Sequence, residues 1–200
     1  MKNNQPFIAG ITGGIGSGKT TAAKFFEELG VPVYNSDTRA KIIQNENSEV
    51  KVKIIEAFGH EAYNESGLNR DYIAKQVFNN NEKLKQLNQI VHPAVFNDFE
   101  EWKKKQTSKI IMKEAAILIE SGSYKDCDVV ISVLMNKEKR IQRIMARDGF
   151  TEEQVMARIN NQISDEERIQ KSDFIIDNND DLAHLKNEVE KTFIKIKKLL

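Results

Sequence analysis

The 200-residue sequence predicts an α/β fold in which a parallel sheet is flanked by helices. The first supporting observation is a strand–helix–strand order near the N-terminus, where apolar segments at 7–11 and 31–34 enclose a glycine cluster and a helical segment. The second is that later apolar segments, at 109–119, 128–134 and 174–176, alternate with segments of helical periodicity. Parallel strands need such crossover connections, so we expect one parallel sheet covered by helices.

The N-terminal elements are defined by their ends. Phe7–Ile11 is a short apolar run that stops at the glycine cluster Gly13–Gly18, as expected of a buried strand followed by a tight loop. A helix is expected over Lys19–Leu29, because Gly30 is the residue type that most often ends a helix. Val31–Tyr34 then forms the second strand of a βαβ unit.

The middle of the chain, from residue 37 to residue 106, has helical periodicity and no strand-like alternation. Asn79–Asn81 and His92–Pro93 are expected to divide it into several helices, because asparagine and proline favour helix ends. We therefore expect a helical insertion in the α/β core.

The remaining elements follow the insertion. Strand character returns at Lys109–Met112, continues into Ala115–Ile119, and returns again at Asp128–Leu134. The highly charged segment Lys137–Lys171 is expected to be helical, and Phe174–Ile176 is the last candidate strand. Apolar residues at steps of three or four then predict an amphipathic C-terminal helix. They are Leu182, Leu185, Val189, Phe193, Ile196 and Leu200.

The composition excludes several functions. Lys and Arg together number 30, as do Asp and Glu, so the formal net charge is zero and general binding to nucleic acid or acidic lipid is not expected. The longest apolar run, Ala115–Ile119, is too short for a transmembrane helix, and the N-terminus does not resemble a signal peptide, so we expect a cytoplasmic protein. The single cysteine, Cys127, excludes an internal disulfide and a multi-cysteine zinc site, and we interpret it as a buried or inert thiol.

The segment Gly13–Thr20 fits the pattern G-x-x-x-x-G-K-[ST] in full. Its glycines let the backbone turn tightly around an anion, and the loop N–H groups attract phosphate together with the N-terminus of the following helix. Lys19 is expected to reach the β- and γ-phosphates, and Thr20 offers its hydroxyl to Mg²⁺. We therefore predict an ATP-binding loop with Mg²⁺ as the cofactor. Its residues are Gly14, Ile15, Gly16, Ser17, Gly18, Lys19, Thr20 and Thr21.

Regulatory GTPases are an alternative class of proteins that contain such a loop. That class needs an Asp-x-x-Gly switch, which occurs nowhere in the chain, and an Asn-Lys-x-Asp motif that reads guanine. The segment Asn136–Lys139 follows an apolar strand but ends in a lysine, which cannot accept hydrogen bonds from guanine. A small-molecule kinase is favoured, and a nucleotide-dependent regulatory switch is the alternative from another class.

Asp37 follows the second strand, at the carboxyl edge of the sheet where α/β proteins bind ligands. A carboxylate there can orient or accept the proton of an attacking hydroxyl. The alternative is that Asp37 is the N-cap of a helix over Thr38–Gln44.

Three arginines, Arg140, Arg143 and Arg147, recur at i, i+3 and i+7 and so share one helical face. A row of guanidinium groups can clamp a transferring phosphate from a closing lid. The alternative is a solvated face whose arginines pair with acids such as Asp148 and Glu152.

Taken together, these residues resemble the dephospho-CoA kinase family, almost from end to end. The resemblance begins at Ile11–Thr20, and the Asp-Ala-Asp that the family carries after its second strand reads Asn35–Asp37 here, which puts the catalytic base on Asp37. Asn69-Arg70 and His92-Pro93 are similar to the family's Asp-Arg and His-Pro signatures, which implies that Arg70 and His92 bind the substrate. A helix end before Pro93 is the alternative for His92.

Further matches extend the resemblance. The family's Pro-Leu-Leu-Phe-Glu is similar to Ala116–Glu120, which implies that Glu120 lies at the substrate. Glu114 either supports Mg²⁺ through water or is a solvated strand-end residue. Arg143 and Arg147 match a lid Arg-x-x-x-Arg and so acquire a catalytic role beside Lys19 and Asp37, whereas Arg140 has no counterpart in that pattern. A lid glutamine and an adenine-side asparagine are matched by Gln162 and Asn178.

The resemblance implies a three-layer P-loop kinase fold in a single unit. We expect the core at approximately 5–45, 107–136 and 172–200, a helical substrate domain at 46–106, and a lid at 137–171. The implied substrates are ATP and dephospho-CoA, and the implied products are ADP and CoA. A kinase for another nucleoside-like acceptor is the nearest alternative.

Overall fold

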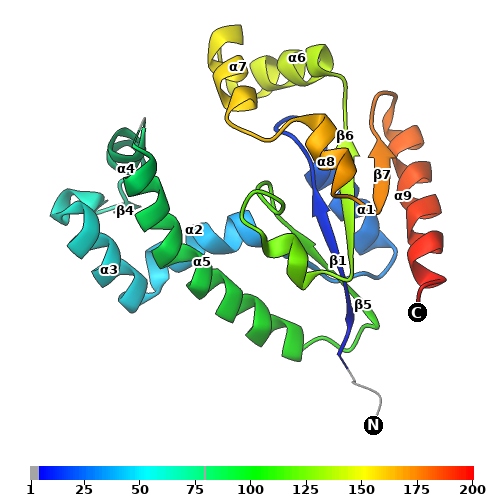
Figure 1. Cartoon of the computed structure of the whole chain (residues 1–200), viewed down its shortest axis with the longest axis horizontal. Coiled ribbons are helices and arrows are strands. Elements are labelled where there is room, and N and C mark those ends of the chain that lie inside the picture. The colour runs from blue at the N-terminus through cyan, green and yellow to red at the C-terminus, as the bar shows by residue number, and fades with distance from the viewer. Residues whose placement is uncertain (1–4, 79) are drawn as a thin grey trace. The chain divides into compact units, whose positions relative to one another are not determined.

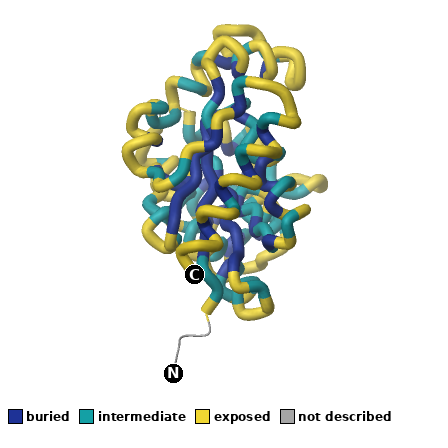
Figure 2. The backbone as a smooth tube through the Cα atoms, turned by 90° about the vertical axis from the view of Figure 1, so that its right-hand side faces the viewer, coloured by how far each residue is buried: buried dark blue, intermediate teal, exposed yellow. Residues whose placement is uncertain are grey.

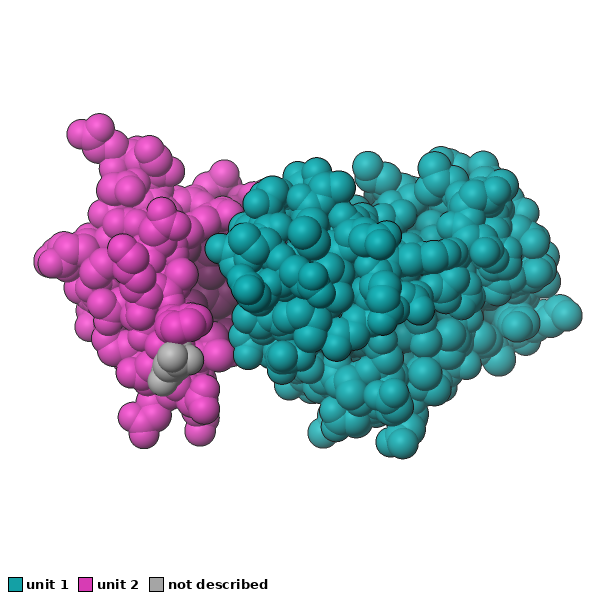
Figure 3. Space-filling view, turned by 90° about the horizontal axis from the view of Figure 1, so that it is seen from above, with its two compact units in different colours: residues 1–35, 106–200 teal, residues 36–105 magenta. Residues whose placement is uncertain are grey.

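The structure is a computed structural model that describes residues 5–78 and 80–200. It divides into two compact units (Figure 3). The first contains the described residues up to Asn35 together with those from Gln106 onward, and the second contains Ser36–Lys105.

The core of the first unit is a parallel sheet. Its strand order is β2-β5-β1-β6-β7, with each neighbouring pair parallel (Figure 1). The strands are β1 (Phe7–Thr12), β2 (Val33–Asn35), β5 (Ile110–Glu114), β6 (Val129–Leu134) and β7 (Phe174–Asp177). The predicted parallel α/β sheet is therefore confirmed.

Helices α1 (Lys19–Glu28) and α9 (Leu182–Lys197) cover one face of the sheet (Figure 1). Alternate strand residues such as Ala9 and Ile11 meet the apolar sides of these helices, so the strands form the most continuously buried part of the backbone (Figure 2). Gly30 ends the first helix as expected, with a φ of 83°. Leu185, Val189 and Ile196 of the predicted apolar side of α9 are buried, whereas Leu182 is exposed.

The segment Ala115–Ile119 is not a strand, so that prediction is wrong. β5 ends at Glu114, and the chain then turns back over the other face of the sheet, where Leu118 packs with Ala115 and Val130. A Cβ on Gly10 would lie 2.7 Å from Leu118 Cδ2 and 2.8 Å from Cys127 Sγ, so this glycine lets the turn approach the sheet closely. Ala115, Leu118 and Ile119 are buried on the sheet rather than in it, while Ile117 is exposed, and periodicity cannot separate burial on a sheet from burial within one.

Cys127 packs under the same turn, just after a short 3-10 helix (Ser123–Asp126), and its surroundings determine its reactivity. Burial raises the pKa of the thiol to about 12, so the thiolate is not formed near neutral pH. This agrees with the interpretation of an inert thiol.

The charged segment after β6 forms three helices. They are α6 (Lys137–Asp148), α7 (Glu152–Asn160) and α8 (Asp165–Gln170). Side-chain caps at Asn136, Thr151 and Ser164 start them, and Gly149 ends the first with a φ of 70°. The predicted helical character is confirmed, and the caps explain the divisions.

The second unit is mainly helical. Its helices are α2 (Ser36–Glu46), α3 (Ser48–Phe58), α4 (Arg70–Val77) and α5 (Asn81–Lys104). Their apolar sides enclose a core that includes Ile54, Phe58 and Ile73. Helix α2, all but the last residue of which falls inside the predicted core range 5–45, belongs to this unit. No helix in the described part of the chain is long and apolar enough to cross a bilayer.

Two predictions for this unit are wrong. His92–Pro93 does not divide it, because α5 continues through Pro93. A short hairpin, missed in the sequence, pairs β3 (Tyr63–Asn64) with β4 (Gly67–Leu68) after a 3-10 turn (His60–Ala62). Two-residue strands are too short to show alternation. The division near 79–81 is confirmed by Asn80, whose side chain caps α5, while Asn79 lies outside the described residues.

Candidate active site

The loop between β1 and α1 has the geometry that an anion-binding loop requires. Gly16 and Gly18 have φ values of 81° and 91°, which side chains other than glycine rarely adopt. The Ser17 N–H donates to the Gly14 carbonyl at 3.0 Å, which closes a tight turn. Helix α1 begins at Lys19, so its free N–H groups and the positive end of its dipole lie at the end of the loop.

Glu114 lies at the centre of the polar groups beside this loop. Its Oε1 accepts hydrogen bonds from Lys19 Nζ at 2.6 Å and from Thr20 Oγ1 at 2.7 Å. Its Oε2 accepts from Asn35 Nδ2 at 2.7 Å. Only 2% of Glu114 is exposed, so the alternative of a solvated strand-end residue is wrong.

This arrangement follows from the topology. Asn35 and Glu114 are the last residues of two parallel strands and are partners in their register, so both side chains reach the carboxyl edge of the sheet beside the loop. A hydroxyl and a carboxylate that meet there are hard oxygen ligands of the kind that Mg²⁺ prefers. Thr20 and Glu114, the two residues predicted for the metal, are therefore brought together.

Asn178 packs against the other side of the loop. It follows β7, is 2% exposed, and donates through Nδ2 to the Ser17 carbonyl at 2.7 Å. A Cβ on Gly18 would lie 2.1 Å from Asn178 Nδ2, so the asparagine and the loop backbone are in direct contact. Next to it is an open cavity of about 540 Å³. Its lining residues are Arg143, Asn178, Asp180, Asp181, Leu182 and Ala183.

The three arginines of α6 differ in their surroundings. Arg140 is buried, at 5% exposure, and its Nη1 lies 3.3 Å from Asp165 Oδ1. Arg143 is exposed, and its Nη1 lies 3.5 Å from the Gly16 carbonyl of the loop. Arg147 is exposed and makes two hydrogen bonds of 2.7 Å to Asp148, which raise its pKa. The alternative prediction, a solvated arginine paired with an acid, therefore holds for Arg147, while Arg143 lies at the phosphate loop.

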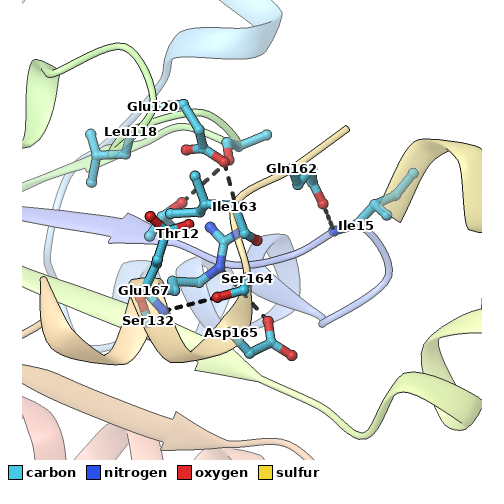
Figure 4. A network of polar contacts seen from close by, with 12 residues as sticks. Thr12, Ile15, Leu118, Glu120, Ser132, Gln162, Ile163, Ser164, Asp165 and Glu167 are labelled. Atoms are coloured by element: carbon cyan, nitrogen blue, oxygen red, sulfur yellow. Dashed lines mark hydrogen bonds and ion pairs between the residues drawn. The ribbon is translucent and has the colours of Figure 1, made fainter. Parts of the chain in front are cut away.

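A second polar network was not foreseen (Figure 4). Arg168 is fully buried, and its Nη2 lies 3.7 Å from Glu120 Oε1, while its Nε lies 3.9 Å from Asp165 Oδ1. Burial lowers the pKa of Arg168, and the two carboxylates oppose that shift. Glu120, predicted to bind substrate, thus pairs with Arg168. In a segment as charged as 165–168, the sequence carries no signal that one arginine is buried.

The other predicted site residues belong to the second unit. Helix α2 begins at Ser36, so Asp37 lies within its first turn and the N-cap alternative is wrong. Arg70 is exposed and begins α4, after an N-cap by Asn69. His92 lies within α5 and lines a cavity of about 550 Å³ with Leu84 and other residues of that helix, so it does not end a helix.

His92 provides a test by pH. Burial lowers its pKa, so the folded state favours the neutral imidazole. As the pH falls, the unfolded chain therefore binds a proton at this group before the folded chain does. The contribution of neutral His92 to the free energy of unfolding is complete above about pH 6.5, and it is lost as the pH falls toward the lower pKa of the folded state. We expect the free energy of unfolding to fall less between about pH 7 and about pH 5 in His92→Gln than in the parent. Urea titrations at both pH values measure this, and equal losses would contradict it.

Comparison with known proteins identifies the family. Residues 7–184 match the family model described as dephospho-CoA kinase. The chain belongs to the dephospho-CoA kinase family. Its relatives include the dephospho-CoA kinase of Fusobacterium nucleatum, 41% identical over 92% of this chain and 95% of the relative, and that of Salinibacter ruber, 40% identical over 90% and 92%.

Solved structures agree with this family assignment. The protein TT1252 from Thermus thermophilus has a TM-score of 0.85 at 31% identity, covering 96% of this chain and 98% of its own. Dephospho-CoA kinase from Campylobacter jejuni has a TM-score of 0.69 at 31% identity, covering 96% and 97%. Shikimate kinase from Acinetobacter baumannii, at 16% identity and a TM-score of 0.58, shares the fold alone. The predicted P-loop kinase fold and dephospho-CoA kinase family are thereby confirmed.

Proposed function

We propose that this chain transfers the γ-phosphate of ATP to the ribose 3′-hydroxyl of dephospho-CoA and forms CoA and ADP. The observation that carries the proposal is that Lys19 and Thr20 of the phosphate loop both donate hydrogen bonds to the buried carboxylate of Glu114. It occurs in a chain that belongs to the dephospho-CoA kinase family over residues 7–184.

The phosphate loop supports the donor side of this proposal. Phosphoryl transfer needs little covalent help from the protein, so catalysis comes mainly from positioning and from charges placed beside the phosphates. The loop N–H groups and Lys19 would bind the phosphates of ATP. Lys19 donates to Glu114, so to bind a phosphate oxygen it must exchange that contact at least in part.

The metal side is proposed from the donor set. Thr20 Oγ1 and the carboxylate of Glu114 fit Mg²⁺, because it prefers oxygen ligands and keeps several waters. When bound with ATP, Mg²⁺ neutralises charge on the β- and γ-phosphate oxygens. Asn35 would hold Glu114 in position through its hydrogen bond to Oε2.

The acceptor side rests on the residues that the family resemblance assigned. Asp37 would orient the ribose hydroxyl and take its proton. Arg70 and His92 of the second unit, and Glu120 of the first, are proposed contacts of dephospho-CoA. We propose the second unit, Ser36–Lys105, as the acceptor-binding domain and residues 137–171 as the lid.

The lid arginines give a kinetic prediction. Arg143 already lies at the loop, whereas Arg147 is held by Asp148; we propose that both make their full contacts with phosphate only when the lid closes. Alanine at either position should therefore lower kcat more than it raises the KM for dephospho-CoA, because the lost contact is made mainly in the transition state. Steady-state kinetics of both variants measure this. A change confined to KM would show uniform binding instead.

A panel of acceptors tests the proposed function. The protein is incubated with Mg-ATP and dephospho-CoA, AMP, adenosine or shikimate, and ADP release is followed in each case. We expect rapid turnover with dephospho-CoA alone. Preference for another acceptor would indicate a kinase of different specificity, and nucleotide binding without transfer to any of them would indicate a regulatory switch.

A further inference from the structure

We propose that Arg140 is a positioning residue for the phosphate loop: Asp165 fixes its guanidinium, and Arg168, which is itself paired with Glu120, lies beside Asp165. The inference rests on the proposed function for its catalytic consequence. Its structural part concerns ATP binding alone and can be tested without an acceptor.

Helix α6 lies directly against the loop backbone. A Cβ on Gly14 would lie 2.1 Å from Arg140 Nη1, and a Cβ on Gly16 would lie 2.9 Å from Ile144 Cδ1 and 3.1 Å from the Arg140 carbonyl. A Cβ on Gly14 would displace the end of the Arg140 side chain, and a side chain at Gly16 is disfavoured in addition by its φ of 81°, so glycine at both positions lets α6 lie close to the loop. The position of the loop therefore depends on where Arg140 and Ile144 hold it.

Asp165 connects Arg140 to Arg168, near the end of the proposed lid segment 137–171. Its Oδ1 lies 3.3 Å from Arg140 Nη1 and 3.9 Å from Arg168 Nε. Arg168 in turn contacts Glu120 at 3.7 Å and the Ile163 carbonyl at 3.4 Å. Both arginines are at least nine-tenths buried, so the groups are fixed by packing as well as by charge.

The same segment contacts the loop at a second point. Gln162 Oε1 accepts a hydrogen bond from the Ile15 N–H at 2.8 Å, as Figure 4 shows. Residues 162–168 thus hold two successive loop residues, Gly14 through the Arg140–Asp165 pair and Ile15 through Gln162. The Ile15 N–H is therefore directed at Gln162, and a shift of this segment would move the backbone of a loop whose other N–H groups are expected to face phosphate.

The charges in this network cancel. Two guanidinium groups face two carboxylates, so the set adds little net potential at the phosphates and its effect must come from geometry. The network also includes buried groups that lower the stability of the fold. Within the described residues, Arg140 Nε and two nitrogens of Arg168, Nε and Nη1, are buried without a hydrogen-bond acceptor, and buried donors left unpaired are costly. Apolar residues often replace buried ion pairs without loss of stability.

The proposal is tested by Arg140→Gln, Asp165→Asn and the double variant, beside Arg140→Lys as the conservative variant and one control. We measure ATP affinity with a fluorescent ATP analogue in the absence of acceptor, then kcat and KM, and the melting temperature. Misplacement of a site by about 1 Å costs roughly a hundredfold in rate, so we expect each single variant to weaken ATP binding and lower kcat/KM for ATP by roughly ten- to hundredfold. Arg140→Lys should recover part of the loss, because its ammonium can still reach Asp165.

The Asp165→Asn variant separates position from charge. If Arg140 and Arg168 acted as phosphate-directed charges, removing the carboxylate would tighten ATP binding. We expect weaker binding, and a double variant no worse than the poorer single variant, because both changes remove the Arg140–Asp165 contact. Lys186→Gln, which breaks the exposed Lys186–Glu28 pair of 3.0 Å, is the control and should match the parent.

Two outcomes would overturn the proposal. One is tighter or unchanged ATP binding in Asp165→Asn. The other is a lowered melting temperature in Arg140→Gln with parental ATP affinity, which would leave Arg140 with a structural role only. Failure of the parent to phosphorylate dephospho-CoA would instead contradict the proposed function, and the affinity measurements would be unaffected.

Discussion

Replacing Lys19 by alanine should abolish most phosphoryl transfer. Lys19 is the loop residue whose ammonium can reach the β- and γ-phosphates, and its Nζ already lies at the site, 2.6 Å from Glu114. Removing a charge that is preorganised for the transition state typically costs roughly 10²-fold or more in kcat. Single-turnover kinetics with saturating Mg-ATP and dephospho-CoA measure the loss. A folded variant with near-parental turnover would contradict the role of the loop.

The structure requires a control for this variant. Lys19 is 11% exposed and its partner Glu114 is 2% exposed, so alanine leaves a buried carboxylate with one charged partner fewer. We expect the melting temperature of Lys19→Ala to fall for that reason. In Lys19→Ala/Glu114→Gln the uncompensated charge is gone, so stability should recover while turnover stays low. Recovery of turnover would show that the single variant failed through misfolding.

Asp37→Asn should lower turnover by roughly 10²-fold or more while leaving the fold and ATP binding intact. The amide keeps the shape of the side chain but cannot accept the hydroxyl proton, and a positioned acid–base group usually contributes in this range. Asp37 lies in the first turn of α2, where a negative charge stabilises the helix by about 0.3–1 kcal/mol, so the loss of stability should be small. Melting temperature, ATP affinity and kcat measure the three effects.

Asp37→Ala is the matched variant, because it removes the side chain instead of its charge alone. If Asp37 serves only the helix, Asn and Ala should both retain kcat and differ only slightly in melting temperature. If it handles the proton, both should lose kcat to a similar extent. Near-parental kcat in the Asn variant would leave the general base unassigned.

The parts of the site that the sequence predicts are local or fixed by topology. The phosphate loop is a contiguous pattern between a strand and a helix, so Lys19 and Thr20 could be assigned without knowledge of the fold. Glu114 was a candidate through the family resemblance, and the structure shows that it ends β5 at the carboxyl edge of the sheet. Its partner Asn35 ends the neighbouring strand, but the pairing of the two needed the sheet register.

The network around Arg168 could not be predicted in this way. Its carboxylates and guanidinium groups come from α6, α8 and the turn after β5, and no sequence spacing relates them. Charged residues are usually solvated, so the sequence gives no reason to expect that Arg168, within the charged helical segment 137–171, is buried. Packing decides its burial, and packing is a property of the tertiary structure.

The errors in the fold have the same origin. The apolar run Ala115–Ile119 satisfies the pattern of a strand, but it is buried by folding over Gly10 and Val130. Pro93 satisfies the pattern of a helix end, yet α5 continues through it for eleven further residues, to Lys104. In both cases tertiary contacts override a local preference.

The position of the transferred phosphate tests the central claim most directly. The protein is incubated with Mg-ATP and dephospho-CoA, and the product is examined by phosphorus NMR and mass spectrometry beside authentic CoA. We predict one new phosphate on the ribose 3′-oxygen, formed in equal amount with ADP and absent without the protein. ADP formed without a phosphorylated acceptor, or a phosphate at another position, would contradict the account.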